Sequence, residues 1–136
     1  MLELNATITG FSRVDFDKKK IRKALRAEGG IIRKAARGMV SRKIMASAPG
    51  EYPARQTGTL MRSIKVRVSR PGFLVKIAPY KTAAMPMFYP AVLHAGSKKM
   101  NIAPRKNFMT DALDARREQS RAAILNALED ALIPRK

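Results

Sequence analysis

The first residues of the chain alternate between apolar and polar side chains. Apolar residues occupy every second position across residues 2–8, and Gly10 ends the run. A period of two is typical of a strand that buries one face and exposes the other. The pattern therefore predicts a β-strand over residues 2–8.

From about Asp15 the apolar residues recur with the period of a helix. On a wheel that advances by about 100° per residue, eight of them share one side, which we expect to face a core. They are Ile21, Ala24, Leu25, Ile31, Ile32, Ala35, Ala36 and Met39. Gly29 and Gly30 in the middle allow a kink or a close approach by a neighbour. We expect the helix to be bent or interrupted there.

Basic residues of the same segment gather on the opposite side of the wheel. Six of them fall within an arc of about 120°. They are Arg22, Lys23, Arg26, Arg33, Lys34 and Arg37. Two interpretations of this stripe stay open: it contacts a polyanion or an acidic partner, or it is an ordinary solvated helix face.

Alternation returns in the second half of the chain. The runs 64–68 and 73–77 flank a Pro-Gly turn and predict a β-hairpin. Residues 88–96 are apolar and aromatic and end in Gly-Ser, so they predict a further strand. Pro90 places that strand at an edge or a bulge, because proline has no N–H to donate to a ladder.

A second long helix is predicted over residues 107–132. Asn107 is a suitable N-cap, and the polar residues 116–121 in the middle are expected to project beyond the domain body. Loops are predicted at two segments. Residues 47–58 contain prolines and glycines with little periodicity, and the prolines in residues 78–87 break the strand pattern.

The order of these elements predicts an α+β fold. We expect a small, mostly antiparallel sheet with a long N-terminal helix and a C-terminal helix packed on it. A chain of 136 residues is long enough for one core and short for two. Residues 1–136 are therefore expected to form a single domain.

The net charge of the chain indicates that the protein has a partner. The chain has 28 Lys and Arg residues against 10 Asp and Glu, a formal net charge of +18. Self-repulsion of this size favours a polyanion or an acidic surface as a partner. The excess is concentrated in residues 1–104, which hold 21 bases and five acids. A hydrophobic fraction of 46% argues against a disordered basic tail.

The same composition argues against several classes of function. There is no cysteine, and no apolar run approaches the roughly 18 residues that span a bilayer, so neither disulfides nor a membrane role is expected. The acids are dispersed and His94 is the single histidine, so we predict no catalysis, no metal and no cofactor. His94 is interpreted as a histidine that bonds the backbone at a strand end. No secretory signal is recognised, and the protein is expected to remain in the cytoplasm unless it leaves inside a larger particle.

Three segments together resemble a known family. They are "TITGFSRVDFDKKKIRKAL", "YPARQTGTLMRSIKVRV" and "YPAVLHAGSKKMNIAPRKNFMTDAL". Their order and spacing resemble the head-tail joining, or tail-completion, neck proteins of long-tailed bacteriophages, also called minor tail proteins. The matching positions are Thr57, Gly58, Leu60, Ser63, Ile64, Tyr89, Gly96, Pro104, Phe108, Ala112 and Leu113. Departures from the family pattern include Pro90, Leu93, His94 and Ser97.

The resemblance implies a structural role without catalysis or cofactor. Copies would form a ring of six in the virion neck, around the channel that DNA crosses, after assembly in the host cytoplasm. The neighbours would be connector or stopper proteins on one side and tail terminator or tail tube proteins on the other, with packaged double-stranded DNA as a further contact without sequence specificity.

A closed ring needs two different patches that meet, so we predict subunit contacts in the loops and in the last helix. The candidate residues are Tyr52, Met87, Phe88, Tyr89, Arg116, Arg117 and Arg121. The alternative function is a small basic nucleic-acid-binding protein, similar to ribosomal or nucleoid proteins in size and charge. An aromatic stacking platform for single strands is not indicated, because only eight residues are Phe or Tyr and none is Trp.

Overall fold

The computed structural model describes residues 14–40, 47–54, 57–71 and 74–134. The strand predicted over residues 2–8 and the tip of the predicted hairpin turn lie outside the described residues. The elements are β1 (Val14–Phe16), α1 (Lys18–Met39), α2 (Thr59–Ser63), β2 (Ile64–Val68), β3 (Val75–Pro79), α3 (Tyr89–Ala95), α4 (Phe108–Asp130) and β4 (Leu132–Pro134).

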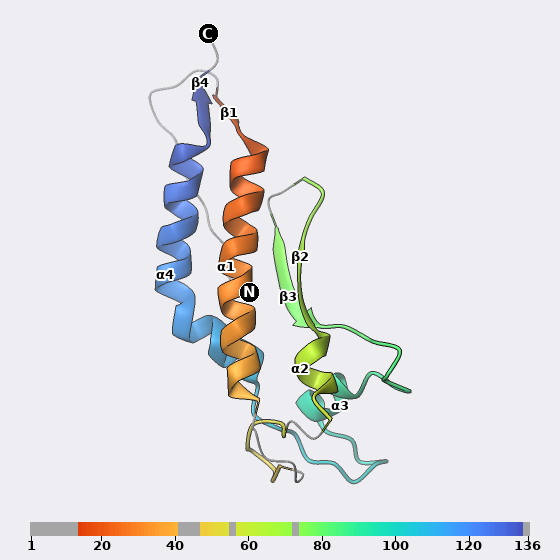
Figure 1. Cartoon of the computed structure of the whole chain (residues 1–136). Helices are drawn as coiled ribbons and strands as arrows, with labels where there is room; N and C mark the ends of the chain where they lie inside the picture. Colours follow the sequence, from red (N-terminus) through yellow and green to blue (C-terminus); the bar gives the residue numbers. More distant parts are fainter. Residues whose placement is uncertain (1–13, 41–46, 55–56, 72–73, 135–136) are drawn as a thin grey trace.

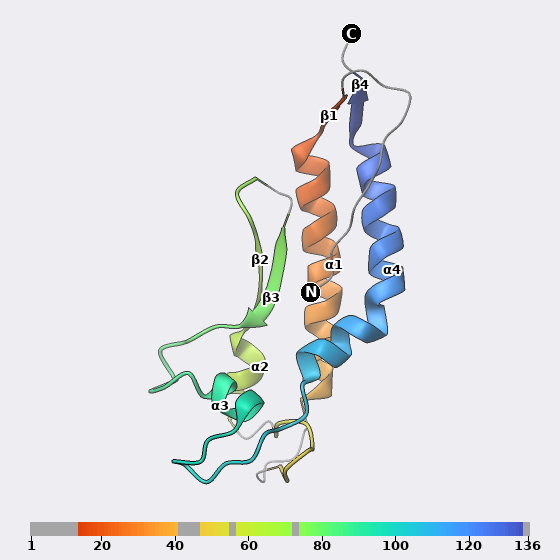
Figure 2. The ribbon, with the colours of Figure 1, turned by 180° about the vertical axis from the view of Figure 1, so that it is seen from behind.

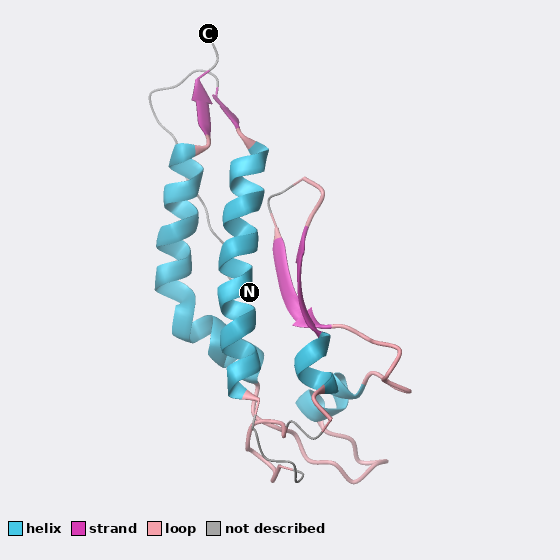
Figure 3. Cartoon of the chain, in the orientation of Figure 1, coloured by secondary structure: helices cyan, strands magenta, loops and turns pink. Residues whose placement is uncertain are grey.

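Helix α1 is the central element of the molecule. It lies between α4, which runs antiparallel beside it, and the β2–β3 hairpin on its other flank (Figures 1 and 2). The small helices α2 and α3 gather at the hairpin end where α1 finishes (Figure 3). The predicted α+β class, with two long helices and small antiparallel sheets, is confirmed.

Within the described ranges, the strands form two separate two-stranded antiparallel sheets. In the hairpin, Ile64 lies opposite Pro79 and Val68 lies opposite Val75. The strand β1 pairs with β4, next to the outer ends of α1 and α4. The described chain therefore begins and ends at the same tip of the helical pair.

The sequence of α1 explains both its start and its buried side. The side chain of Asp17 accepts hydrogen bonds from the backbone N–H groups of Lys19 and Lys20, which caps the first turn. Ile31 contradicts the predicted inward side, since it lies at the edge of the apolar arc and is 42% exposed. Most of the other predicted inward residues pack in two clusters that also include residues of the hairpin and of α4. The fully or nearly buried ones are Ile21, Leu25, Ile32 and Ala36.

The predicted bend or interruption at Gly29 and Gly30 was wrong, because α1 runs as one helix through both residues and its ribbon shows no kink there (Figure 1). The close approach by a neighbour, which these glycines were also expected to allow, is present at Gly29. A Cβ atom added there would lie 2.7 Å from Cγ1 of Val66 and 3.1 Å from Cγ2 of Val75. Gly29 therefore allows the hairpin to approach the backbone of α1.

The predicted strand over residues 88–96 was also wrong, because Tyr89–Ala95 form the helix α3. Pro90 is tolerated in the first turn of a helix, where no partner for an N–H is required. Gly96 ends the helix with a φ of 75°, and its N–H donates to the carbonyl of Val92 at 2.7 Å. A short apolar run cannot be assigned to helix or strand by its period alone.

The C-terminal helix was predicted well at its start but not in its middle. Asn107 caps α4 through hydrogen bonds from the N–H groups of Met109 and Thr110. The polar middle does not project beyond the domain: Ser120 is 0% exposed, and its hydroxyl donates to Oε2 of Glu28 at 2.8 Å. A polar residue could be buried there because Glu28 lies on the inner side of α1. No helix in the described part of the chain is long and apolar enough to cross a membrane.

Candidate functional site

The six basic residues predicted on α1 do share one side of the helix, but they differ in their surroundings. Arg22, Arg33 and Arg37 are half-buried. Two of these arginines donate to backbone carbonyls of the hairpin, each at 3.0 Å: Nη1 of Arg22 to that of Arg70 in the turn, and Nη2 of Arg37 to that of Ile64 at the start of β2. These side chains therefore fasten α1 to the hairpin.

Arg37 shows the effect of this packing on its charge. Partial burial, and then the nearby positive charge of Arg33, lower the pKa of Arg37 from its usual value. Arginine nevertheless remains charged at neutral pH. Its Nε atom is buried and has no hydrogen-bond partner among the described residues. Arg37 is thus a structural residue of the α1–β2 junction.

The remaining three cations, Lys23, Arg26 and Lys34, are exposed. No acid among the residues that the structure describes forms an ion pair with them, because the ion pairs found there involve Lys106, Arg116 and Arg117. The outward stripe of α1 is therefore narrower than the sequence predicted, with three free cations instead of six.

The hairpin carries a second basic surface on the face turned away from α1. Lys65, Arg67 and Lys76 are exposed there, and Arg67 lies directly opposite Lys76 in the strand register. Like charges opposite one another destabilise a strand pair. The guanidinium of Arg67 stacks over the ring of Tyr80, 3.8 Å from its centroid. The alternation in the sequence predicted both strands but not that Arg67 lies opposite Lys76.

The predicted subunit contacts divide into exposed and internal residues. Met87 and Phe88 are 45% and 40% exposed. Arg117 and Arg121 are also exposed, with Arg117 paired to Asp114 at 2.6 Å. These four remain candidates for contacts with another molecule.

The other three predicted contacts face the inside of the chain. The hydroxyl of Tyr52 donates to Oδ2 of Asp111 at 2.6 Å, and Arg116 pairs with Glu28 at 3.5 Å. Tyr89 is half-buried against the core, and this burial raises its pKa, partly opposed by the charge of Arg62. These three side chains therefore act mainly within the domain.

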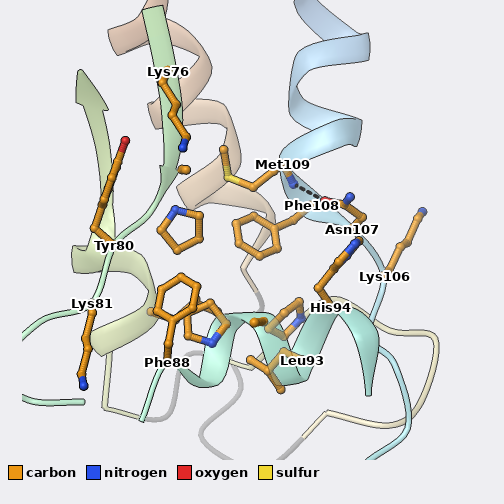
Figure 4. Close-up of a pocket in the computed structure, with 16 residues that line it drawn as sticks. Lys76, Tyr80, Lys81, Phe88, Leu93, His94, Lys106, Asn107, Phe108 and Met109 are labelled. Atoms are coloured by element: carbon orange, nitrogen blue, oxygen red, sulfur yellow. Dashed lines mark hydrogen bonds between the residues drawn. The ribbon is translucent and has the colours of Figure 1, made fainter. Parts of the chain in front are cut away.

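A pocket of about 620 Å³ opens next to Phe88, and sequence reasoning missed it. Its floor is formed by aromatic and proline rings from segments far apart in the sequence, including Phe88 and Phe108 (Figure 4). Lys76, Lys81 and Lys106 stand around these rings, and His94 reaches in from α3 (Figure 4). None of the described residues that line the pocket is an acid.

The charge of Lys106 is fixed by its neighbours. Its ammonium lies 4.8 Å from the centroid of the Tyr52 ring and 3.6 Å from Oδ2 of Asp111. The hydrogen bond and the electrostatic attraction between Lys106 and Tyr52, followed by the charge of Asp111, raise the pKa of Lys106. Lys76 and Lys81 are exposed and have no ion-pair partner within the described ranges.

The described residues of this arrangement offer positive charge and an apolar surface. His94 is exposed on α3, which is a helix and not the strand end that was predicted. Among the described residues, no group of three or more His, Cys, Asp or Glu side chains could hold a metal ion. No family model, no curated protein and no solved structure matches the chain.

Proposed function

We propose that the chain is a structural protein of a bacteriophage neck, which assembles as a ring around the DNA channel and joins the filled head to the tail. The observation that carries this proposal is the set of exposed cations on α1 and on the hairpin that have no acidic partner among the described residues. A ring around DNA needs positive charge that contacts phosphates without reading bases.

The family resemblance supports the proposal through the positions that it matches. Leu60, Ser63 and Ile64 are buried where α2 meets β2, and Ala112 is fully buried on α4. Gly96 has a positive φ and lies against Pro104, another matched residue. The resemblance is therefore concentrated at positions that determine how the chain packs.

The neck role is tested with a phage in which the gene for this protein is disrupted by an early stop codon. Filled heads and finished tails are expected to accumulate separately, as seen by electron microscopy and by sedimentation of the lysate. A plasmid copy of the gene is expected to restore joined particles. Normal joined particles without the protein would rule out the proposed role.

The alternative is a free nucleic-acid-binding protein, which the same cations support. It predicts that the protein sediments with ribosomes or nucleoid and not with virion particles. A ring of defined copy number on purified tails would favour the neck role, whereas ribosome association in uninfected cells would favour the alternative.

A further inference from the structure

The pocket beside Phe88 combines an apolar lining with positive charge, a combination that an ordinary solvated surface does not require. Its floor is apolar and built from rigid rings, and its rim is basic without a compensating acid among the described lining residues. Phe88, which lines the pocket, and the adjacent Met87 are 40% and 45% exposed, so accessible apolar surface continues beside the pocket. Exposed apolar surface in a polar frame marks interaction sites.

The rim specifies the charge of the occupant. Lys76 lies above the rings, and Lys81 lies on the side away from Lys106 with its ammonium directed outward (Figure 4). Neither Lys76 nor Lys81 has an ion-pair partner among the described residues. Lys106 is already shared with Asp111. An acidic occupant would pair with Lys76 and Lys81. It would also relieve the repulsion between Lys76 and Arg67, which lie opposite each other in the hairpin.

We propose that this pocket binds a short acidic segment of a partner protein, which inserts an apolar side chain between Phe88 and Phe108 and turns carboxylates toward Lys76 and Lys81. A second copy of the chain is disfavoured as the source, because the chain has 10 acids against 28 bases. Proline and phenylalanine rings offer flat faces on which a peptide side chain packs. The proposal goes beyond the neck role and does not depend on it, since a free protein would bind the same segment.

The test uses the full chain and a fluorescein-labelled peptide with the sequence Asp-Glu-Phe-Leu-Glu-Asp. Fluorescence polarisation in about 0.15 M salt is expected to give a Kd on the order of 10–100 μM. Two control peptides replace either the apolar pair by serine or the acids by asparagine and glutamine. Each is expected to bind about tenfold more weakly or worse. Equal binding of the serine peptide would reduce the interaction to general charge attraction and overturn the proposal.

Two matched pairs of variants locate the site. Ala91→Glu puts a carboxylate at the pocket lining, whereas Ala95→Glu makes the same change one turn later on α3, outside this pocket. The first is expected to raise the Kd by about tenfold or more and the second by less than about twofold. Equal effects of the two substitutions would overturn the proposal.

The second pair separates the rim from the net charge. Lys76→Gln with Lys81→Gln is expected to raise the Kd by about fivefold, which corresponds to two exposed charge contacts. Lys98→Gln with Lys99→Gln removes the same charge from a turn outside this pocket and is expected to leave the Kd within about twofold. An equal rise in the Kd for both double variants would indicate general charge attraction to the peptide and would overturn the proposal.

A measurement on the unchanged protein covers the case in which a variant fails to fold. Titration with the peptide is expected to shift the amide NMR signals of α3 and of Asn107, which lines the pocket. Shifts confined to α1 would overturn the proposal. Two other probes test other occupants: a 20-base-pair duplex and dodecanoate. If Ala91→Glu weakens the binding of the duplex but not of the peptide, the pocket binds a nucleic acid instead. If it weakens the binding of dodecanoate but not of the peptide, the pocket binds a lipid instead.

Discussion

At the scale of single residues, Glu28 determines how the two long helices are aligned. It lies on the inner side of α1 and is 7% exposed. Its carboxylate accepts from Ser120 at 2.8 Å and pairs with Arg116 at 3.5 Å, both on α4. A buried carboxylate is tolerated only where such partners meet it, so a shift of α4 along α1 would leave these groups unpaired.

Glu28→Ala is therefore expected to destabilise the protein by about 2 kcal/mol. The substitution leaves the buried hydroxyl of Ser120 without its acceptor and Arg116 without its acid. The estimate stays below that for a fully buried pair because the Arg116 side chain is 33% exposed. Urea unfolding followed by circular dichroism measures the loss. Glu118→Ala, at an exposed position of α4, is the control and should change stability by less than about 0.5 kcal/mol.

The adjacent glycines of α1 give opposite predictions for the same substitution. Gly30→Ala is expected to stabilise the protein by about 0.5–1 kcal/mol, because nothing lies within 4 Å of the new Cβ. Gly29→Ala gains the same helix propensity but brings Cβ to 2.7 Å from a stiff valine side chain of the hairpin. We expect a net loss of about 1 kcal/mol. Equal thermal unfolding midpoints for the two variants would show that the hairpin moves away freely.

At the scale of elements, the hairpin stores an unfavourable charge pair. Lys76→Glu would place an acid opposite Arg67, and we expect a gain of about 0.5 kcal/mol in the free energy of unfolding at low salt. The gain should shrink in about 0.5 M NaCl because salt screens exposed charges. Lys99→Glu makes the same charge change in an exposed turn. If Lys99→Glu stabilises equally, the gain comes from the lower net charge and not from the strand pair.

The exposed cations of α1 make a separate prediction about DNA. Replacing Lys23, Arg26 and Lys34 by glutamine is expected to reduce the slope of log K against log salt for a duplex by about 2–3. Lys98, Lys99 and Arg121, which are exposed and lie outside α1, provide a control with equal charge loss when they are replaced in the same way. Filter binding at several salt concentrations gives both slopes. Equal slopes for the two triple variants would mean that α1 does not contact the duplex.

The elements show which parts of the fold could be predicted from the sequence. The period of α1, the cap at Asn107 and the alternation of the hairpin depend on neighbours in the chain, and all three were predicted correctly. Helix α3 was missed because a run of seven mostly apolar residues is too short for its period to distinguish a helix from a strand. The burial of Ser120 and the pocket beside Phe88 depend on residues far apart in the sequence, which no local pattern brings together.

At the scale of the whole molecule, the net charge of +18 works against the compact state. A polyanion that binds the folded protein should stabilise it more than salt alone does. A duplex at about 100 times its Kd contributes about 2.7 kcal/mol, which corresponds to a rise in Tm of roughly 8 °C for a chain of this size. Neutral dextran should have almost no effect, and about 0.5 M NaCl should abolish the effect of the duplex because the counterions compete.

The triple glutamine variant of α1 separates two origins of this stabilisation. If the exposed side of α1 supplies the contact, the variant should lose a large part of the rise in Tm caused by the duplex, even though its own repulsion is smaller. If the duplex acts only by relieving charge over the entire surface, the two triple variants should lose equal parts of the rise. A duplex that leaves the Tm unchanged at low salt would contradict a polyanion contact anywhere on the protein. The neck role would then depend on acidic protein neighbours alone, of the kind proposed for the pocket beside Phe88.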